Sequence, residues 1–318
     1  MTVPLDDLFA ELDARLPGAV TRHVPLAALT TYKLGGPVAV LVRVHSEGDL
    51  PALAAVVRQH RPPLLFVGRG SNLLVADAGF AGLGVVLEGA FEELTIAPDG
   101  TSGDGPDGPE GWVAAGGAVP LPVLARRAAA AGRTGLEFYV GIPGSVGGAV
   151  RMNAGGHGRE TTEVLVHARV ADLAGSGEVT ERDPEALGLG YRHSDLGPTD
   201  VVVGAVFRSE ADDVAACEVR VAEIVRWRRE HQPGGANAGS VFANPDGDSA
   251  GRLIDAAGLK GFRVGGAVVS DKHANFIQAD AGATAADVRA LVLEVQRRVR
   301  EDSGVELRPE LRMVGFDA

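Results

Sequence analysis

Two glycine-rich segments constrain the fold more than any other feature of the sequence. GRGSNLL (68–74) directly follows an apolar run, and GIPGSVGGAV (141–150) is rich in glycine throughout. Glycine tolerates positive φ angles and close backbone approach, so such loops can direct several N–H groups at a phosphate. The alternative is a pair of tight turns that bind no ligand. Neither segment reads GxxxxGK[ST] or GxGxxG, which excludes the P-loop and the Rossmann dinucleotide fingerprint.

The first part of the chain alternates strand-like and helix-like segments. VAVLVRV (38–44), LLFVG (64–68) and GVVLEG (84–89) read as strands. Ser46 followed by Asp49 is a capping-box start for a helix between the first two strands. The core face of this helix holds Leu50, Leu53, Ala54 and Val57. This β-α-β order predicts an α/β subdomain over residues 1–88.

We expect a second subdomain over residues 89–209. Residues 98–111 are nearly all turn formers and acids, which predicts a flexible surface loop between hairpin strands. PLPVLARRAAAAG (120–132) reads as a helix that proline opens and glycine closes. Strand candidates are WVAAGGAV, HARVADL and VVVGAVFRSE.

From Ala211 onward the pattern turns helical. Apolar residues, Cys217 among them, mark the core face of a helix that ends near Arg229. Thr284 with Asp287 caps a later helix, which Gly304 closes. Its core face holds Val288, Leu291, Val292, Val295 and Val299. We therefore expect a third, α+β domain over residues 210–318.

Composition excludes several classes of partner. The net charge of the 318 residues is −12, which argues against duplex nucleic acid and anionic lipid as partners. One cysteine allows no internal disulfide, and no run of about 18 apolar residues could span a membrane. HExxH and CxxC motifs are absent, so the sequence predicts no metal site. Without a signal-peptide pattern, we expect a cytoplasmic protein; a monomer is the expectation, although no motif specifies the oligomeric state.

Seven segments, taken in order, resemble the UDP-N-acetylenolpyruvoylglucosamine reductase (MurB) family. They extend from Thr30 to Gly315; each is modest alone, and their common order is specific. The resemblance implies an α+β fold with a two-part FAD-binding domain of the vanillyl-alcohol-oxidase (PCMH) type and a C-terminal α+β substrate-binding domain. The segments are TTYKLGGP, GRGSNLLV, GLEFYVGIPGSVGGAVRMNAG, YRHSDL, AGSVFANP, AGRLIDAAGLKGFRVGGAVVSDKHANFI and RPELRMVG.

The resemblance also implies FAD as cofactor and NADPH as co-substrate. The first glycine loop has no histidine for covalent attachment, so non-covalent FAD is expected. The residues implied to line it are Tyr32, Leu34, Gly35, Gly68, Arg69, Gly70, Ser71, Asn72, Leu73, Gly141, Ile142, Pro143, Gly144, Ser145, Gly147, Gly148 and Asn153.

The family reaction passes hydride from reduced flavin to an enolpyruvyl ether. It needs a fixed positive charge near the substrate carboxylate and a proton source for a carbanion-like carbon. By resemblance, Arg192 supplies the charge, Ser240 the proton, and Glu310 shares a proton or orders a water. Without the resemblance, the ordinary interpretation of Arg192 is a surface ion pair. That of Ser240 is a turn cap, and that of Glu310 is a solvated charge.

Asn244, Arg312 and His231 are the implied substrate contacts, and His231 stands where the family often has lysine. The stretch between Arg192 and Ser240 is short, as in the family class that lacks an inserted tyrosine loop. For His273, a structural role is the favoured interpretation.

Two other functions remain open at this stage. Another flavin oxidoreductase on the same fold would keep the glycine loops but need not keep the three catalytic residues together. A nucleotide-sugar-binding protein without activity would have no need of them either.

Overall fold

The computed structural model describes residues 5–97 and 111–316. These residues form two compact units, and each is described by itself. Unit 1 holds residues 5–22, 40–69, 82–97 and 111–227, and unit 2 holds residues 23–39, 70–81 and 228–316. The acidic loop predicted at 98–111 lies, except for its last residue, outside the described residues. Within those ranges no helix has both the length and the apolar character of a membrane span.

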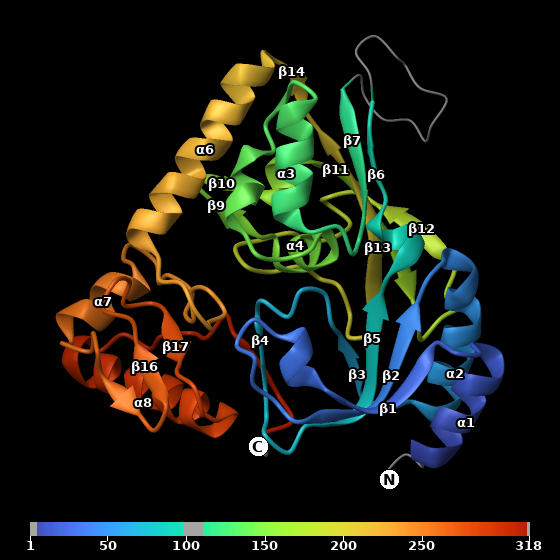
Figure 1. Cartoon of the computed structure of the whole chain (residues 1–318), viewed down its shortest axis with the longest axis horizontal. Coiled ribbons are helices and arrows are strands. Elements are labelled where there is room, and N and C mark those ends of the chain that lie inside the picture. Colours follow the sequence, from blue (N-terminus) through green and yellow to red (C-terminus); the bar gives the residue numbers. More distant parts are fainter. Residues whose placement is uncertain (1–4, 98–110, 317–318) are drawn as a thin grey trace. The chain divides into compact units, whose positions relative to one another are not determined.

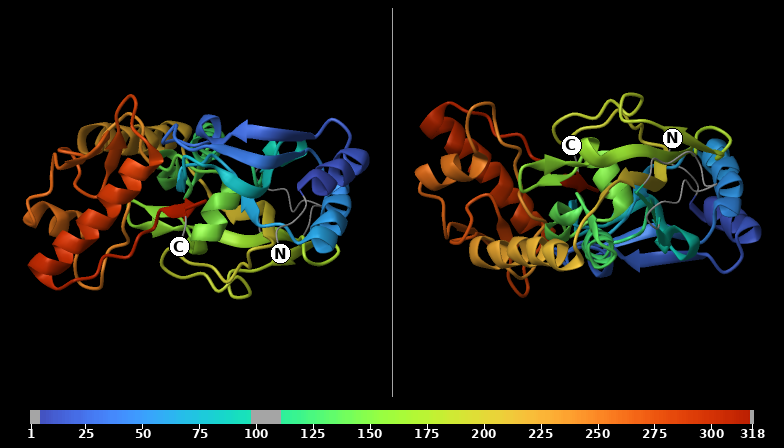
Figure 2. Two further views of the ribbon diagram at one scale, coloured as in Figure 1. Left: turned by 90° about the horizontal axis from the view of Figure 1, so that it is seen from below. Right: turned by 90° about the horizontal axis from the view of Figure 1, so that it is seen from above.

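The first sheet has the strand order β1-β2-β5-β3. Its strands are β1 (Val20–Pro25), β2 (Pro37–Val44), β3 (Leu64–Phe66) and β5 (Phe80–Leu87). Helices α1 (Leu5–Arg15) and α2 (Leu50–His60) lie side by side in every ribbon view (Figures 1 and 2), and their leucines share a core with β2 and β5. The predicted capping box is confirmed, because Ser46 N donates to Asp49 Oδ2 at 2.8 Å.

The second sheet is antiparallel, in the order β12-β11-β13-β7-β6. Its strands are β6 (Leu94–Ile96), β7 (Trp112–Gly116), β11 (Leu165–Asp172), β12 (Val179–Arg182) and β13 (Asp200–Arg208). β6 pairs with β7, so the expected hairpin around the acidic loop is confirmed. β13 is buried along all but its last residue, as its unbroken apolar run requires. Ala171 and Val201 join the core of the first sheet, so the two sheets share one interior.

Two helices pack on this second sheet through the core around Tyr139 and Phe207. They are α3 (Leu121–Ala130) and α4 (Val146–Met152), with the 3₁₀ turn η4 (Glu137–Gly141) between them. Helix α3 ends as predicted, because Gly132 follows with φ of +66°. Shorter elements are η1 (Leu26–Leu29), η2 (Glu47–Asp49), η3 (Gly89–Glu92), β8 (Arg133–Thr134), β9 (Gly155–Gly156), β10 (Arg159–Glu160), α5 (Thr161–Val164) and β14 (Glu210–Ala211).

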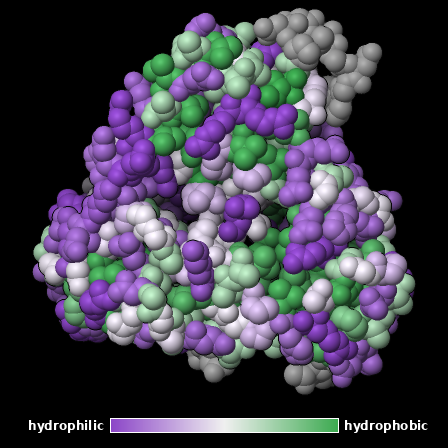
Figure 3. Space-filling view, viewed as in Figure 1, coloured by the Kyte–Doolittle hydropathy of each residue, from purple (hydrophilic) through white to green (hydrophobic). Residues whose placement is uncertain are grey.

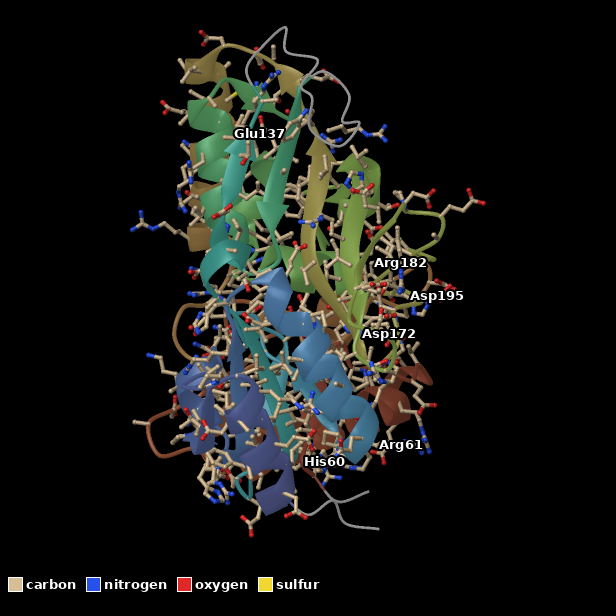
Figure 4. The ribbon with its side chains drawn as sticks, turned by 90° about the vertical axis from the view of Figure 1, so that its right-hand side faces the viewer. His60, Arg61, Glu137, Asp172, Arg182 and Asp195 are labelled. Atoms are coloured by element: carbon tan, nitrogen blue, oxygen red, sulfur yellow. The ribbon has the colours of Figure 1, made fainter. Side chains whose placement is uncertain are left out.

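Helix α6 (Val214–His231) extends slightly past its predicted end at Arg229. Cys217 is fully buried in the core of unit 1, as its position on the apolar stripe predicts. Arg220 on the same helix bonds Glu137 Oε1 at 2.9 Å and Thr134 Oγ1 at 3.1 Å, and Glu137 is labelled in Figure 4. The C-terminal half of α6 presents mostly hydrophilic side chains (Figure 3). The helix is thus fastened to unit 1 by its first half.

Unit 2 combines two N-terminal segments with the C-terminal part of the chain. β4 (Leu73–Val75) pairs in parallel with β18 (Arg312–Val314). β15 (Arg263–Val264), β16 (Ala267–Val269) and β17 (Ile277–Ala279) form an antiparallel sheet, and the helices are α7 (Ala250–Ala256) and α8 (Ala285–Ser303). The predicted cap of α8 is confirmed, because Asp287 N donates to Thr284 Oγ1 at 3.0 Å.

Tyr32 and Leu74 are buried in the same core as the apolar face of α8. Two segments from the first quarter of the sequence therefore stabilise the C-terminal unit. The division of contacts falls at 227/228, within α6. The three-domain boundaries at 88/89 and 209/210 stay a prediction.

Candidate active site

The first glycine loop requires glycine for packing reasons. A Cβ on Gly68 would lie 2.5 Å from Ser145 Oγ, and a Cβ on Gly70 would lie 2.0 Å from Leu29 O. Gly70 also has φ of +60°, a conformation that side chains rarely adopt. Arg69 and Ser71 flank it. Gly68 and Ser145 therefore bring the two glycine segments into contact within unit 1.

The second glycine loop packs α4 closely against its sheet. Val146 N donates to Val119 O at 3.0 Å and Gly147 N to Gly117 O at 2.8 Å. A Cβ on Gly147 would lie 3.0 Å from Val202 O. These first two N–H groups of α4 are thus used inside the protein. Gly141, Ile142, Pro143 and Gly144 lead into the helix, and Gly148 lies in its first turn.

A backbone cradle that any Cβ would fill is what a close-bound pyrophosphate requires. Gly68 beside Ser145 forms such a cradle, because a Cβ on Gly68 would lie 2.5 Å from Ser145 Oγ; a Cβ on Gly148 would lie 3.6 Å from that atom, an ordinary contact. The residues present therefore fit FAD.

Tyr32, Leu34 and Gly35 belong to unit 2. Tyr32 Oη donates to Ile277 O at 3.1 Å, and burial raises the pKa of this phenol above its ordinary value. A Cβ on Gly35 would lie 2.7 Å from Val75 Cβ. The Tyr32 side chain is therefore a core group, so a cofactor contact here falls to the backbone.

Asn153 ends α4 in the left-handed conformation, with φ of +40°, and is 1% exposed. Its amide nitrogen donates to Glu160 Oε2 at 2.9 Å and to Gly190 O at 3.0 Å, and Oδ1 accepts from Thr162 N at 2.9 Å. The Asn153 side chain thus joins α4 to the turn that carries the predicted catalytic arginine.

Arg192 lies in a tight turn that Gly190 and His193 close with two hydrogen bonds of 3.1 Å. Its φ of +54° places a non-glycine residue where a turn favours glycine or asparagine. The guanidinium donates to Gly155 O at 3.3 Å, lies 3.5 Å from Glu160 Oε1, and stacks 4.9 Å from the Tyr191 ring centre. A strained backbone that carries a well-held cation is typical of a functional position.

Ser240 and Glu310 come together within unit 2. Ser240 forms a bridge with Phe276, and Glu310 N donates to the carbonyl of Val241, the residue after Ser240, at 2.8 Å. The catalytic serine and glutamate predicted from the sequence therefore lie on neighbouring extended segments, although they are far apart in the chain.

The three predicted substrate residues lie in two places. Asn244 follows Ser240 closely, and its Oδ1 accepts from Ala250 N at 3.1 Å. Arg312 opens β18 shortly after Glu310, and its N–H donates to Asn72 O at 3.1 Å. His231 is the last residue of α6.

The three residues predicted to be catalytic are thus divided between the units. Arg192 belongs to unit 1, whereas Ser240 and Glu310 belong to unit 2. The structure describes the contacts of each group within its own unit.

Two polar residues of this region were not predicted from the sequence. Glu160 contacts both Asn153 and Arg192. Asn275 is 4% exposed; its Oδ1 accepts from Phe242 N at 3.0 Å and its amide donates to Phe242 O at 2.8 Å. No nearby sequence pattern indicates the contacts of either residue, because the partners of each lie far along the chain or across a turn.

His273 has a structural environment. Its ring lies 4.8 Å from that of Phe276, Asn275 N donates to its Nδ1 at 3.3 Å, and burial lowers the pKa of the imidazole. Within residues 5–97 and 111–316, no group of three or more His, Cys, Asp or Glu side chains is arranged to hold a metal ion.

Comparison with known proteins places this geometry in a family. An FAD-binding-domain model matches residues 38–181, and a model of the UDP-N-acetylenolpyruvoylglucosamine reductase C-terminal domain matches residues 231–314. Together they confirm the predicted fold class, an FAD-binding part followed by a C-terminal α+β domain.

Whole-length relatives agree with the family models. The chain is 44% identical to the UDP-N-acetylenolpyruvoylglucosamine reductase of Methylorubrum extorquens, over 95% of this chain and 94% of the relative. It is 41% identical to that of Nitrobacter winogradskyi, over 99% and 100%. The crystal structure of MurB from Thermus caldophilus matches with a TM-score of 0.75 and 38% identity, over 92% and 98%. The chain therefore belongs to the UDP-N-acetylenolpyruvoylglucosamine reductase family.

Proposed function

We propose that the chain reduces UDP-N-acetylglucosamine enolpyruvate to UDP-N-acetylmuramate, with NADPH as reductant and non-covalent FAD, in peptidoglycan precursor synthesis. The observation that carries the proposal is the pairing of the Ser240 and Glu310 segments through Val241. It supports a shared site for two residues that the family resemblance assigns to one reaction.

The cofactor residues are those of the glycine cradle. Gly68, Gly144, Ser145 and Gly148 hold the pyrophosphate, and FAD when bound supplies the hydride-transfer chemistry. Packing fixes the backbone around Gly68 and Ser145, so N–H groups of this backbone can donate to the anion without reorganisation.

Arg192 binds the carboxylate of the enolpyruvyl group. Its guanidinium stays charged and presents parallel N–H groups that match a carboxylate. As negative charge spreads from the reacting carbon into the carboxylate, this fixed cation stabilises it more in the transition state than in the ground state.

Ser240 gives its hydroxyl proton to the carbanion-like carbon. A serine is a very weak acid, but a carbanion is basic enough to take its proton. No histidine base is required, because this serine is not a nucleophile. Glu310 shares a proton with the developing enol or orders a water beside it.

Asn244, Arg312 and His231 bind the nucleotide-sugar portion. The short interval between Arg192 and Ser240 supports the class without an inserted tyrosine loop, so the substrate is covered by other residues. We further propose a cytoplasmic monomer.

The test is a pair of anaerobic half-reactions with the FAD-loaded protein. NADPH should bleach the flavin, and UDP-N-acetylglucosamine enolpyruvate should then restore the oxidised spectrum. Bleaching without reoxidation would point to a different acceptor on the same fold. A protein that takes up no FAD, even on reconstitution, would refute the proposal.

A further inference from the structure

Glu160 is the one carboxylate that contacts both Asn153 and Arg192 among the interactions described for unit 1. Oε2 accepts from Asn153 Nδ2 at 2.9 Å, and Oε1 lies 3.5 Å from Arg192 Nη1. The side chains of Glu160 and Arg192 are 30% and 21% exposed. The pair is therefore half-buried at a strained turn and is not an ordinary surface ion pair.

The backbone of Glu160 is itself fixed. It ends β10 and precedes α5, and its N–H donates to Glu163 Oε1 at 2.7 Å. Asn153, which holds one carboxylate oxygen, is anchored in turn by Thr162 and Gly190. The second oxygen is thus presented to Arg192 from a rigid support.

The guanidinium of Arg192 makes one hydrogen bond and one ionic contact, at different nitrogens. Nη1 lies toward Glu160, and Nη2 donates to Gly155 O at 3.3 Å. Two contacts at different nitrogens fix the plane of a planar group, whereas one contact lets it rotate. A guanidinium binds a carboxylate through two parallel hydrogen bonds only when its plane is aligned with that of the carboxylate.

We propose that Glu160 is a positioning residue, which holds the plane of the Arg192 guanidinium for the substrate carboxylate; this rests on the proposed function. The negative charge of Glu160 by itself would act against substrate binding. A carboxylate beside Arg192 repels the carboxylate of the substrate, so it weakens ground-state binding. Orientation of the arginine offsets this cost by raising the rate of the chemical step.

The variant Glu160→Gln distinguishes the repulsion of the substrate carboxylate from the orientation of the Arg192 guanidinium. The glutamine keeps the shape and an oxygen for Asn153 but loses the charge that draws Nη1. We expect KM for the enolpyruvyl substrate to stay unchanged or fall, and kcat to fall by about 10- to 100-fold, the scale of a misplaced catalytic group. Reduction of the flavin by NADPH should change by less than about 2-fold, since the substrate carboxylate takes no part in it.

A double-mutant cycle shows whether Glu160 acts through Arg192. In the Arg192→Lys background, Glu160→Gln should cause little further loss, because contacting residues that work as a unit are not additive. The matched control is Glu47→Gln, also in unit 1, whose ion pair with Arg169 at 2.7 Å is exposed; it should leave both half-reactions unchanged. Fully additive losses, or equal losses in both half-reactions, would overturn the inference.

A second readout does not depend on turnover. Crystal structures of the wild type and of Glu160→Gln should show one guanidinium position in the first and a displaced or multiple position in the second. An unmoved Arg192 guanidinium in the variant would overturn the inference whatever the activity. If the wild type fails to reduce the enolpyruvyl substrate, the proposed function fails, and the crystallographic comparison still decides the role of Glu160.

Discussion

The side-chain amide of Asn72 donates a hydrogen bond of 3.1 Å to the backbone carbonyl of Glu310. In turn, the backbone N–H of Arg312 donates to Asn72 O at 3.1 Å. A residue of the first glycine loop thus fixes the backbone on which the predicted catalytic glutamate stands. In unit 2, the loop attributed to the cofactor and the segment attributed to catalysis are one hydrogen-bonded structure.

Asn72→Ala should therefore affect the second half-reaction more than the first. Loss of one hydrogen bond should lower the free energy of unfolding by about 0.5–1.5 kcal/mol, measured by urea denaturation. Stopped-flow rates should show slower flavin reoxidation by the substrate, because Glu310 is less firmly placed. A larger loss in flavin reduction by NADPH would mean that Asn72 serves the cofactor instead.

Ser240→Ala should separate the half-reactions more sharply. Removing the proton donor should slow substrate reduction by about 10²–10⁴-fold, the usual scale of general acid catalysis. Flavin reduction by NADPH should stay close to that of the wild type, because it needs no proton from this serine. Stopped-flow absorbance of the flavin measures both rates, and equal losses in the two would remove Ser240 from the mechanism.

Asn275→Ala should destabilise the protein, because Asn275 satisfies both backbone groups of Phe242. The buried N–H and C=O would each lose a partner, at a cost of about 1–3 kcal/mol for each group. Asn237→Ala is the matched control, since the Asn237 amide donates to exposed loop carbonyls of Gly234 and Gly235. Urea denaturation of both variants measures the loss of unfolding free energy. Similar small losses in the two would contradict the role of Asn275 in satisfying the Phe242 backbone.

The sequence predicts much of the local structure because caps and apolar faces are local signals. Ser46 with Asp49 and Thr284 with Asp287 form the capping boxes that their spacing indicates. The apolar face predicted for the last helix is buried throughout. In such cases the contacts that decide the conformation lie within one or two turns.

The pairing of β4 with β18 shows what local signals lack. Leu73 lies opposite Arg312, and nothing near either residue specifies a partner so far along the chain. For the same reason the sequence did not show that residues 70–81 belong with the C-terminal unit. Seven family segments in order implied the candidate catalytic residues, but Glu160 and Asn275 emerge only from their tertiary partners.

Acid should weaken the attachment of α6 through Glu137. Burial raises the pKa of this carboxyl, but hydrogen bonds from Arg220, Thr134 and Gly135 outweigh it, so the pKa lies below its ordinary value of 4.5. The stabilisation is therefore complete above pH 4.5 and is lost as the pH falls through the lowered folded-state pKa.

Glu137→Gln makes this pH dependence measurable. The difference in unfolding free energy between wild type and variant should be largest above pH 4.5 and should shrink as the pH falls below that value. Urea denaturation at a series of pH values gives the difference directly. Glu163→Gln, at an exposed ion pair, is the control. A difference that grows toward acid would contradict the assigned direction of the pKa shift.

Gly155→Ala should damage the arginine site, whereas Gly156→Ala should not. A Cβ on Gly155 would lie 2.6 Å from Arg159 O, 2.9 Å from Glu160 Cγ and 3.3 Å from Arg192 Nη1, whereas a Cβ on Gly156 would meet nothing within 4 Å. Neither glycine has positive φ, so the pair differs in the space beside each Cα and not in backbone strain.

The backbone contact in Gly155→Ala cannot be relieved by a rotamer change, so the segment between Asn153 and Glu160 must shift. Because that shift moves the support of Arg192, we expect slower flavin reoxidation by the substrate, by about 10-fold or more. Gly156→Ala should react at the wild-type rate. Stopped-flow measurement of the two variants side by side checks this, and equal rates would show that the close packing at Gly155 has no bearing on catalysis.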